Sequence, residues 1–265
     1  MYSKAFSTLG CPDLTLEQVI ELGRRFRIDA VELRALEGQL NLPDYFTKRY
    51  GSPEKLRSAL ADTPRIIALD TSFKLIGSSA ADRAQLLAFI PWAEAIGARW
   101  LRVFDGGATL DAAVLAEAKE NLQWWRQTAA ARRISVDLMI ETHDVLLDAA
   151  RIETFTTAMG ALPVALLWDA HHTWKKGGED PVRTWRSIRD RVVHVHVKDS
   201  VSNSQAPLGF TYVEPGAGAF PIAPLRKVLA AEFDGCVSLE WEKVWHPDLG
   251  PLEGALRAAE TSRWW

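Results

Sequence analysis

Short apolar segments alternate with longer amphipathic segments along the whole chain, and this alternation limits the folds open to it. The apolar segments have the length of β-strands, and the segments between them repeat apolar residues at helical spacing. Strands are predicted at residues 4–9, 30–34, 65–71, 99–104, 134–141, 164–169, 192–198 and 236–241. Helices are predicted at residues 15–26, 52–61, 81–96, 111–132, 147–159, 181–189, 222–232 and 252–261.

Strands that alternate with helices predict a parallel sheet, and eight such units predict a sheet that closes on itself. The length of 265 residues is typical of one such barrel. We therefore expect an α/β protein with a single (β/α)8 TIM barrel domain over residues 1–265. An open doubly wound sheet is the alternative, but the first strand is not followed by a Gly-x-Gly-x-x-Gly turn.

Charge and cysteine content narrow the classes of partner. The formal net charge is -3 and no Lys/Arg run is present, so we expect no nucleic-acid partner. The sequence shows neither a signal peptide nor an apolar run long enough to span a membrane, so no membrane partner is expected. Cys11 and Cys236 do not form a disulfide framework and are typical of free thiols in a reducing cytoplasm.

Polar residues end the last four predicted strands. Glu141, Asp169, His196 and Glu240 each follow or end an apolar run. The carboxyl ends of barrel strands form the functional face, and ends of sequential strands lie side by side there. Carboxylates that converge in a partly desolvated site either take up protons or hold a cation. Three oxygen ligands and one nitrogen suit one divalent ion: Mn²⁺, Co²⁺, Mg²⁺ or a catalytic Zn²⁺.

Each of these residues taken alone has a simpler explanation. A strand-end carboxylate is commonly solvated or paired with Lys or Arg, and a lone His is commonly a hydrogen-bonded structural residue. It is their occurrence on four consecutive strand ends that favours the metal site.

Several longer motifs resemble one known family. They are STLGCPDLTLEQVIELG, DAVELR, LRVFDGG, IETHD, WDAHHTWKKGGEDP, HVHVKD, PGAGAFPI and FDGCVSLEWEKVWHP, which together span most of the chain. The chain resembles the xylose isomerase-like TIM-barrel superfamily, and within it the sugar phosphate isomerase/epimerase group. The resemblance implies that Glu141, Asp169, His196 and Glu240 bind one catalytic divalent metal and that His172 contacts substrate. It also implies a small sugar-like substrate and a possible homodimer.

The sequence departs from the family in one loop. Related members often have Gly-Glu-Gly-Glu where this chain has Gly216-Ala217-Gly218-Ala219. The turn glycines are kept and the acidic side chains are not, so we assign this loop no catalytic role.

Further residues are candidates for substrate binding. His143 lies two positions after Glu141, and strand periodicity places both on one side; a surface loop position is the alternative. Arg102 and Arg34 could bind substrate oxygens or a phosphate, although Glu32 and Arg34 share a face and could instead form an internal ion pair.

Three more candidates come from the segments around strands six to eight. Lys198 could stabilise negative charge in the mouth, or pair with Asp199. Trp174 and Trp245 follow strands six and eight and could line the pocket, with loop packing as the alternative.

These residues predict an isomerase or epimerase that acts on a hydroxy-carbonyl substrate through a metal-stabilised enediolate, with Glu141 and Glu240 as general base and acid. A lyase or dehydratase begins with the same proton abstraction and is the alternative. Endonuclease chemistry on abasic DNA would need more His ligands than a chain with six histidines offers, and a basic surface. A barrel that binds a metabolite without turnover is the non-catalytic alternative.

Overall fold

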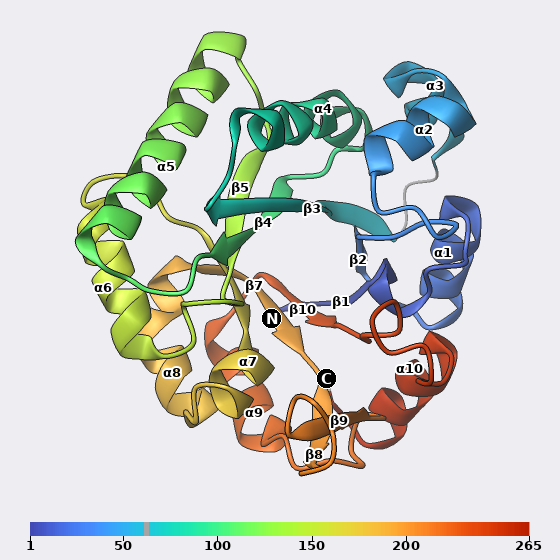
Figure 1. Ribbon diagram of the computed structural model, residues 1–265. Helices are drawn as coiled ribbons and strands as arrows, with labels where there is room; N and C mark the ends of the chain where they lie inside the picture. The colour runs from blue at the N-terminus through green and yellow to red at the C-terminus, as the bar shows by residue number, and fades with distance from the viewer. Residues whose placement is uncertain (61–63, 265) are drawn as a thin grey trace.

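The computed structural model describes residues 1–60 and 64–264. Within these ranges, eight parallel strands close into a barrel in the order β1-β10-β7-β6-β5-β4-β3-β2, with helices outside it (Figure 1). This confirms the predicted single (β/α)8 barrel. The barrel strands are β1 (Ser3–Ser7), β2 (Ala30–Leu33), β3 (Arg65–Ile76), β4 (Trp100–Gly106), β5 (Asp137–Glu141), β6 (Leu166–Asp169), β7 (Val192–Val197) and β10 (Cys236–Leu239).

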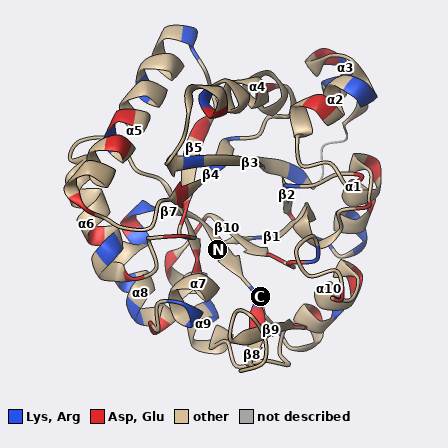
Figure 2. Cartoon of the chain, in the orientation of Figure 1, with Lys and Arg blue, Asp and Glu red and all other residues tan. Residues whose placement is uncertain are grey.

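Helices surround the barrel as an outer ring (Figure 1). They are α1 (Leu16–Arg25), α2 (Leu42–Tyr50), α3 (Pro53–Ala59), α4 (Ala80–Ile96), α5 (Ala112–Arg132), α6 (Ala149–Met159), α7 (Ala170–Lys175), α8 (Pro181–Ile188), α9 (Ile222–Glu232) and α10 (Leu252–Thr261). Basic and acidic residues are mixed over these helices (Figure 2). In the described part of the chain, no helix is both long and apolar enough to cross a membrane.

Local signals explain most of the helix boundaries. Thr15 caps α1 through a capping box with Gln18, and Ser52 caps α3 in front of Pro53. Gly97 ends α4 in the left-handed conformation, at φ 73°. The predicted helix at 52–61 ends at Ala59 in the structure, and Ala61 lies outside the described residues.

Two helices and one two-stranded hairpin were not predicted. Helix α2 starts with Pro43 in its first turn, and α7 begins directly after β6, where the Asp169 side chain accepts a hydrogen bond from the His172 backbone. The predicted loop at 200–219 contains an antiparallel hairpin of β8 (Asp199–Ser202) and β9 (Phe210–Val213). Strand β3 also continues five residues past its predicted end at Thr71, because its register shifts between Asp70 and Lys74 and it pairs with β4 again.

The barrel interior is built in layers, because every second residue of a strand points inward. Ala68, Met139 and Leu167 form one buried apolar cluster. Two residues farther along the same strands come Asp70, Glu141 and Asp169, all buried. The step from one layer to the next therefore changes the barrel interior from apolar to ionic, toward the carboxyl ends of the strands.

The glycine turn at 216–218 has a structural role that accounts for its retained glycines. The Asp199 carboxylate accepts hydrogen bonds from the backbone N–H groups of Gly216, Gly218 and Phe220 at 2.9, 2.9 and 3.0 Å. A Cβ atom at Gly218 would lie 2.1 Å from the carboxylate of Asp199. The turn therefore ties the chain after β9 to the start of β8.

Candidate metal centre

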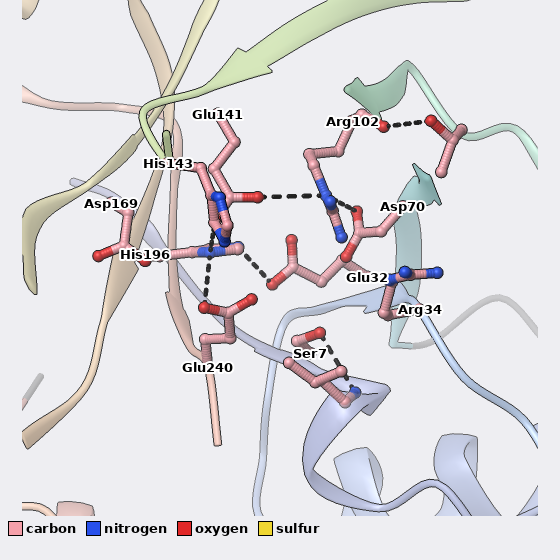
Figure 3. Close-up of polar contacts among 12 residues, drawn as sticks. Ser7, Glu32, Arg34, Asp70, Arg102, Glu141, His143, Asp169, His196 and Glu240 are labelled. Atoms are coloured by element: carbon pink, nitrogen blue, oxygen red, sulfur yellow. Dashed lines mark hydrogen bonds and ion pairs between the residues drawn. The ribbon is translucent and has the colours of Figure 1, made fainter. Parts of the chain in front are cut away.

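The four predicted ligands meet at the carboxyl ends of β5, β6, β7 and β10. One ligand atom from each of Glu141, Asp169, His196 and Glu240 lies within 4.8 Å of the other three. His196 Nδ1 lies 3.3 Å from Glu240 Oε2 and 3.8 Å from Glu141 Oε1 (Figure 3). All four residues are buried, with exposed fractions of 4% or less. The structure thus brings together the residues that the sequence proposed as one site.

Mutual charge shifts the protonation of this group. Burial and the charge of Glu240 raise the pKa of Glu141, and Arg102 opposes this rise. Burial would also raise the pKa of Glu240, but His196 and Lys198 hold that pKa well below its usual value. The pKa of His196 lies well above its usual value because Glu240 and Glu32 outweigh the effect of burial. Two neighbouring carboxyl groups therefore lie in environments that shift their pKa values in opposite directions.

Lys198 is the cation that contacts this group most closely. Its Nζ lies 2.8 Å from Asp169 Oδ2 and 2.6 Å from Glu242 Oε1, and it also forms a short contact with Glu240. These partners differ from the sequence alternative, in which Lys198 paired with Asp199. One ammonium charge faces three carboxylates here, so the anionic side chains remain in excess around it.

Glu32 contacts the ring nitrogen of His196 that faces away from the predicted ligands. Its Oε1 lies 2.9 Å from His196 Nε2, and its Oε2 lies 3.1 Å from His194 Nε2. The Ser238 hydroxyl donates a further hydrogen bond to Glu32 at 2.6 Å. This pairing replaces the Glu32–Arg34 ion pair that the sequence allowed. A carboxylate on one ring nitrogen orients the imidazole and leaves Nδ1 directed at the ligand group, as is usual for metal-binding histidines.

The residues present fit a divalent metal ion. Glu141 Oε2 and His196 Nδ1 are buried and lack a hydrogen-bond partner among the described residues. Such atoms are costly to bury unless something else satisfies them. The set consists of three carboxylates and one imidazole without cysteine, which suits Mn²⁺, Co²⁺, Mg²⁺ or an open zinc site. The group could therefore hold one such ion.

Both predicted substrate-binding histidines lie beside Glu141. The His143 and His172 rings have centroids 4.9 Å apart, and Glu141, His143 and His172 also offer ligand atoms close enough for a shared ion. His172 Nδ1 lies 3.2 Å from Asp169 Oδ2, and its pKa is lowered well below the usual value by burial and Lys198. His143 is one third exposed and lies nearest to solvent. Their places agree with substrate contact, which stays a prediction.

The two predicted tryptophans differ in position. Trp174 packs edge-on against His171 and Phe220, whose ring centroids lie 5.4 and 5.5 Å away. Trp245 lies in the loop after β10 and is 54% exposed, with its backbone N–H bonded to Glu242. Among residues 1–60 and 64–264, no ring contact or hydrogen bond joins either indole to the four predicted ligands. The proposal that they line the pocket remains a prediction.

Arg102 and Arg34 lie on the other side of the mouth, on β4 and directly after β2. Arg102 Nε lies 3.4 Å from Glu141 Oε2 and 3.9 Å from Asp70 Oδ1 (Figure 3). Burial, together with Glu32, raises the pKa of Asp70 to about 7. The mouth is thus divided into an acidic half, formed by β5, β6, β7 and β10, and a half that contains two guanidinium groups.

Asp105 positions the loop that carries His143. This buried carboxylate accepts hydrogen bonds from five backbone N–H groups, those of Gly106 and of residues 143–146, at 2.7–3.3 Å. Burial raises the pKa of Asp105. Gly106, with φ 72°, permits the close approach of its backbone to Ile76 at the end of β3, because a Cβ there would lie 2.4 Å from the Ile76 carbonyl oxygen.

Replacing Asp105 by alanine is expected to lower the free energy of unfolding by about 3 kcal/mol, since buried backbone donors lose a charged acceptor. Asp111→Ala is the matched control: Asp111 caps α5 by accepting two backbone N–H groups at an exposed position, and its loss costs about 1 kcal/mol. Denaturant unfolding followed by tryptophan fluorescence measures both. Equal losses in the two variants would contradict the role of Asp105.

Sequence reasoning missed several members of the site. Glu32, Asp70 and Asp105 were not proposed as site residues, although Glu32 and Asp70 share inward parity with residues of the barrel lining. Glu242 follows Glu240 by two residues, as Lys198 follows His196, so parity alone could have placed this ion pair. Tyr212 comes from the unpredicted hairpin, and its hydroxyl lies 3.4 Å from Glu242.

Comparison with models of known protein families identifies the family of this chain. The family model described as xylose isomerase-like TIM barrel matches residues 16–265. The chain therefore belongs to the xylose isomerase-like TIM-barrel family. No curated protein matched the sequence.

Solved structures similar to this chain share its fold at low sequence identity. A probable 3-DHS dehydratase, AsbF, from Bacillus anthracis has a TM-score of 0.79 and 16% identity, covering 99% of this chain and 100% of that one. The IolI protein with a bound zinc atom has a TM-score of 0.68 and 17% identity, covering 98% and 96%. A D-tagatose 3-epimerase-like protein has a TM-score of 0.65 and 14% identity, covering 98% and 96%. These likenesses establish the fold.

Proposed function

We propose that this protein is a divalent-metal-dependent isomerase or epimerase that acts on a small sugar or sugar-derived hydroxy-carbonyl substrate through an enediolate. The observation that carries the proposal is the convergence of Glu141, Asp169, His196 and Glu240 around one point. The ion would be held by these four residues. When bound, it would supply Lewis-acid stabilisation of the negative charge that develops on two neighbouring substrate oxygens.

The residues of the chain would move the protons. Glu141 and Glu240 come from β5 and from the end of β10, which approach His196 from two sides (Figure 3). One carboxylate would remove the proton next to the carbonyl, and the other would return a proton to the intermediate. His172 and His143 lie beside Glu141 and would bind substrate hydroxyls. Near-complete burial of the group would exclude water from the intermediate.

A lyase or dehydratase is the second candidate, and Lys198 favours it. This buried ammonium contacts Glu240 and Glu242 and would stabilise the negative charge that develops on a leaving hydroxyl of the next carbon. A similar fold in a probable dehydratase is compatible with this option. Product analysis in deuterated water distinguishes the two reactions. An epimerase or isomerase labels a substrate carbon with deuterium, whereas elimination yields an unsaturated product that has lost water.

Metal binding can be tested without a known substrate. Mn²⁺ at 100 times its dissociation constant is expected to stabilise the folded protein by about 2.7 kcal/mol, or about 5 to 10 °C in Tm. The Asp169→Asn variant is expected to lose most of this shift, because it removes one anionic ligand. Asp190→Asn is the matched control, since Asp190 is almost fully exposed. An absent shift in the wild-type protein, or an unchanged shift in Asp169→Asn, would contradict the metal site.

A further inference from the structure

We propose that Arg34 and Arg102 form a second subsite, which binds a carboxylate of the substrate. This inference rests on the proposed function, because it places the far end of the molecule whose hydroxy-carbonyl end reacts at Glu141 and Glu240. It names the substrate class: a small hydroxy-carbonyl acid rather than a neutral sugar.

The two guanidinium groups lie together in the half of the mouth that holds no predicted metal ligand. Arg34 directly follows β2, Arg102 belongs to β4, and Asp70 of the intervening β3 lies near both (Figure 3). Arg34 is 4% exposed and Arg102 is 2% exposed. Both guanidinium groups are therefore largely shielded from solvent, unlike those of most surface arginines.

Arg34 has few partners for a buried charge. Its Nη2 donates a hydrogen bond to the Ser72 hydroxyl at 3.0 Å, and its Nη1 has no hydrogen-bond partner. Among residues 1–60 and 64–264 no carboxylate lies within ion-pair distance of it. A buried guanidinium with a single neutral side-chain acceptor is costly, and an anionic ligand would remove that cost.

Arg102 is held in place but is not saturated. Its guanidinium packs over the Phe104 ring, with Cζ 4.0 Å from the centroid. Its ion-pair contacts with Glu141 and Asp70 are long, and Nε and Nη1 have no hydrogen-bond partner. The side chain is thus oriented by its neighbours while donor groups stay available.

The charges of the two arginines act on one another. Burial and the neighbouring Arg102 lower the pKa of Arg34 to about 10, so Arg34 still carries its charge at neutral pH. The two positive charges of Arg34 and Arg102 repel one another in a buried environment, as the carboxylates of the predicted metal site do. A ligand of opposite charge relieves this repulsion in the same way that a metal ion relieves the other.

A carboxylate fits these donors better than a phosphate. Its two oxygens match the planar fork of a guanidinium, and its single charge suits a place where Asp70 and Glu141 already offset part of the positive charge. A phosphate dianion would leave uncompensated negative charge beside those carboxylates. Arg102 Nε lies only 3.4 Å from Glu141 Oε2. A carboxylate bound by Arg102 would therefore lie close to the carbon that reacts at Glu141, so both groups would belong to one small molecule.

Matched pairs of sugars test the inference. D-Fructuronate and D-tagaturonate differ from D-fructose and D-tagatose only in a terminal carboxylate, and their binding to the Mn²⁺-loaded protein can be measured by calorimetry. We expect the acids to bind at least about 10-fold more tightly than the neutral sugars. Arg34→Met and Arg102→Met keep an unbranched apolar stem and remove the guanidinium charge, and each is expected to abolish the preference for acids. Arg99→Met, at an exposed position directly before β4, is the matched control and is expected to keep this preference.

The outcomes separate this inference from the proposed function. Mn²⁺ binding is measured first and bears on the metal site alone. Equal binding of acids and neutral sugars, no binding of either acid, or an acid preference that survives in Arg34→Met would each overturn the carboxylate subsite while leaving the metal site in place. If Mn²⁺ does not bind, the proposed function fails, and the same comparison on the metal-free protein still decides whether the arginines select acids.

Discussion

Replacing Glu240 by glutamine is expected to preserve the barrel and to lower turnover by at least about 100-fold, the usual size of an acid–base contribution. Glutamine has the same shape and keeps one oxygen, but it can neither accept nor deliver a proton at catalytic rates. The carboxylate of Glu240 lies between His196 and Lys198 in the structure, so its loss also removes the partner of two buried cations.

The measurement needs a substrate and a metal-saturated protein. The rate is compared for the first ketose or keto acid that the wild-type protein turns over, with bound Mn²⁺ quantified in each sample so that lost metal is not counted as lost catalysis. Glu253→Gln is the matched control, because Glu253 is a half-buried surface glutamate of α10 that pairs with Arg25, away from the predicted ligands. Near-normal turnover by Glu240→Gln would remove Glu240 from the mechanism.

Replacing Glu32 by glutamine is expected to weaken Mn²⁺ binding by about 10- to 100-fold, although Glu32 is not one of the predicted ligands. Its carboxylate faces Nε2 of both His194 and His196. Burial and His196 would lower the pKa of His194, but Glu32 outweighs them and the pKa is raised to about 9. Without the negative charge, His196 loses the group that orients its ring and makes Nδ1 a stronger ligand.

Calorimetric titration of Mn²⁺ into the folded variant measures this effect. Glu21→Gln, an exposed position of α1, is the control and is expected to bind Mn²⁺ like the wild-type protein. A thermal unfolding curve recorded without metal reports any loss of stability separately. If Glu32→Gln binds Mn²⁺ as tightly as the wild-type protein, Glu32 has only a structural role.

Much of this fold could be predicted because local patterns and the global topology agree. Each barrel strand is a short apolar run, and the predicted helices at 222–232 and 252–261 coincide with α9 and α10. Helix α7 and the β8–β9 hairpin were missed for physical reasons. The hairpin depends on a tertiary contact, in which the Asp199 carboxylate accepts hydrogen bonds from three backbone N–H groups of a later loop. Helix α7 has only six residues, which is too short for a helical repeat of apolar residues to be visible.

The site was predictable where position along a strand decides it. Glu141, Asp169, His196 and Glu240 end consecutive strands, and barrel closure brings such ends together. The partners of buried charges were harder to predict, since they depend on neighbours across the barrel. Glu32 pairs with histidines of β7 rather than with Arg34, and Lys198 pairs with Glu242 rather than with Asp199.

The position of the bound ion tests the central claim most directly. Anomalous diffraction at the manganese edge, from crystals grown with MnCl₂, locates the ion without reference to activity. We predict one strong peak at about 2.0 to 2.3 Å from oxygens of Glu141, Asp169 and Glu240 and from His196 Nδ1. A peak between Glu141, His143 and His172 instead, or no peak at the ends of these four strands, would contradict it.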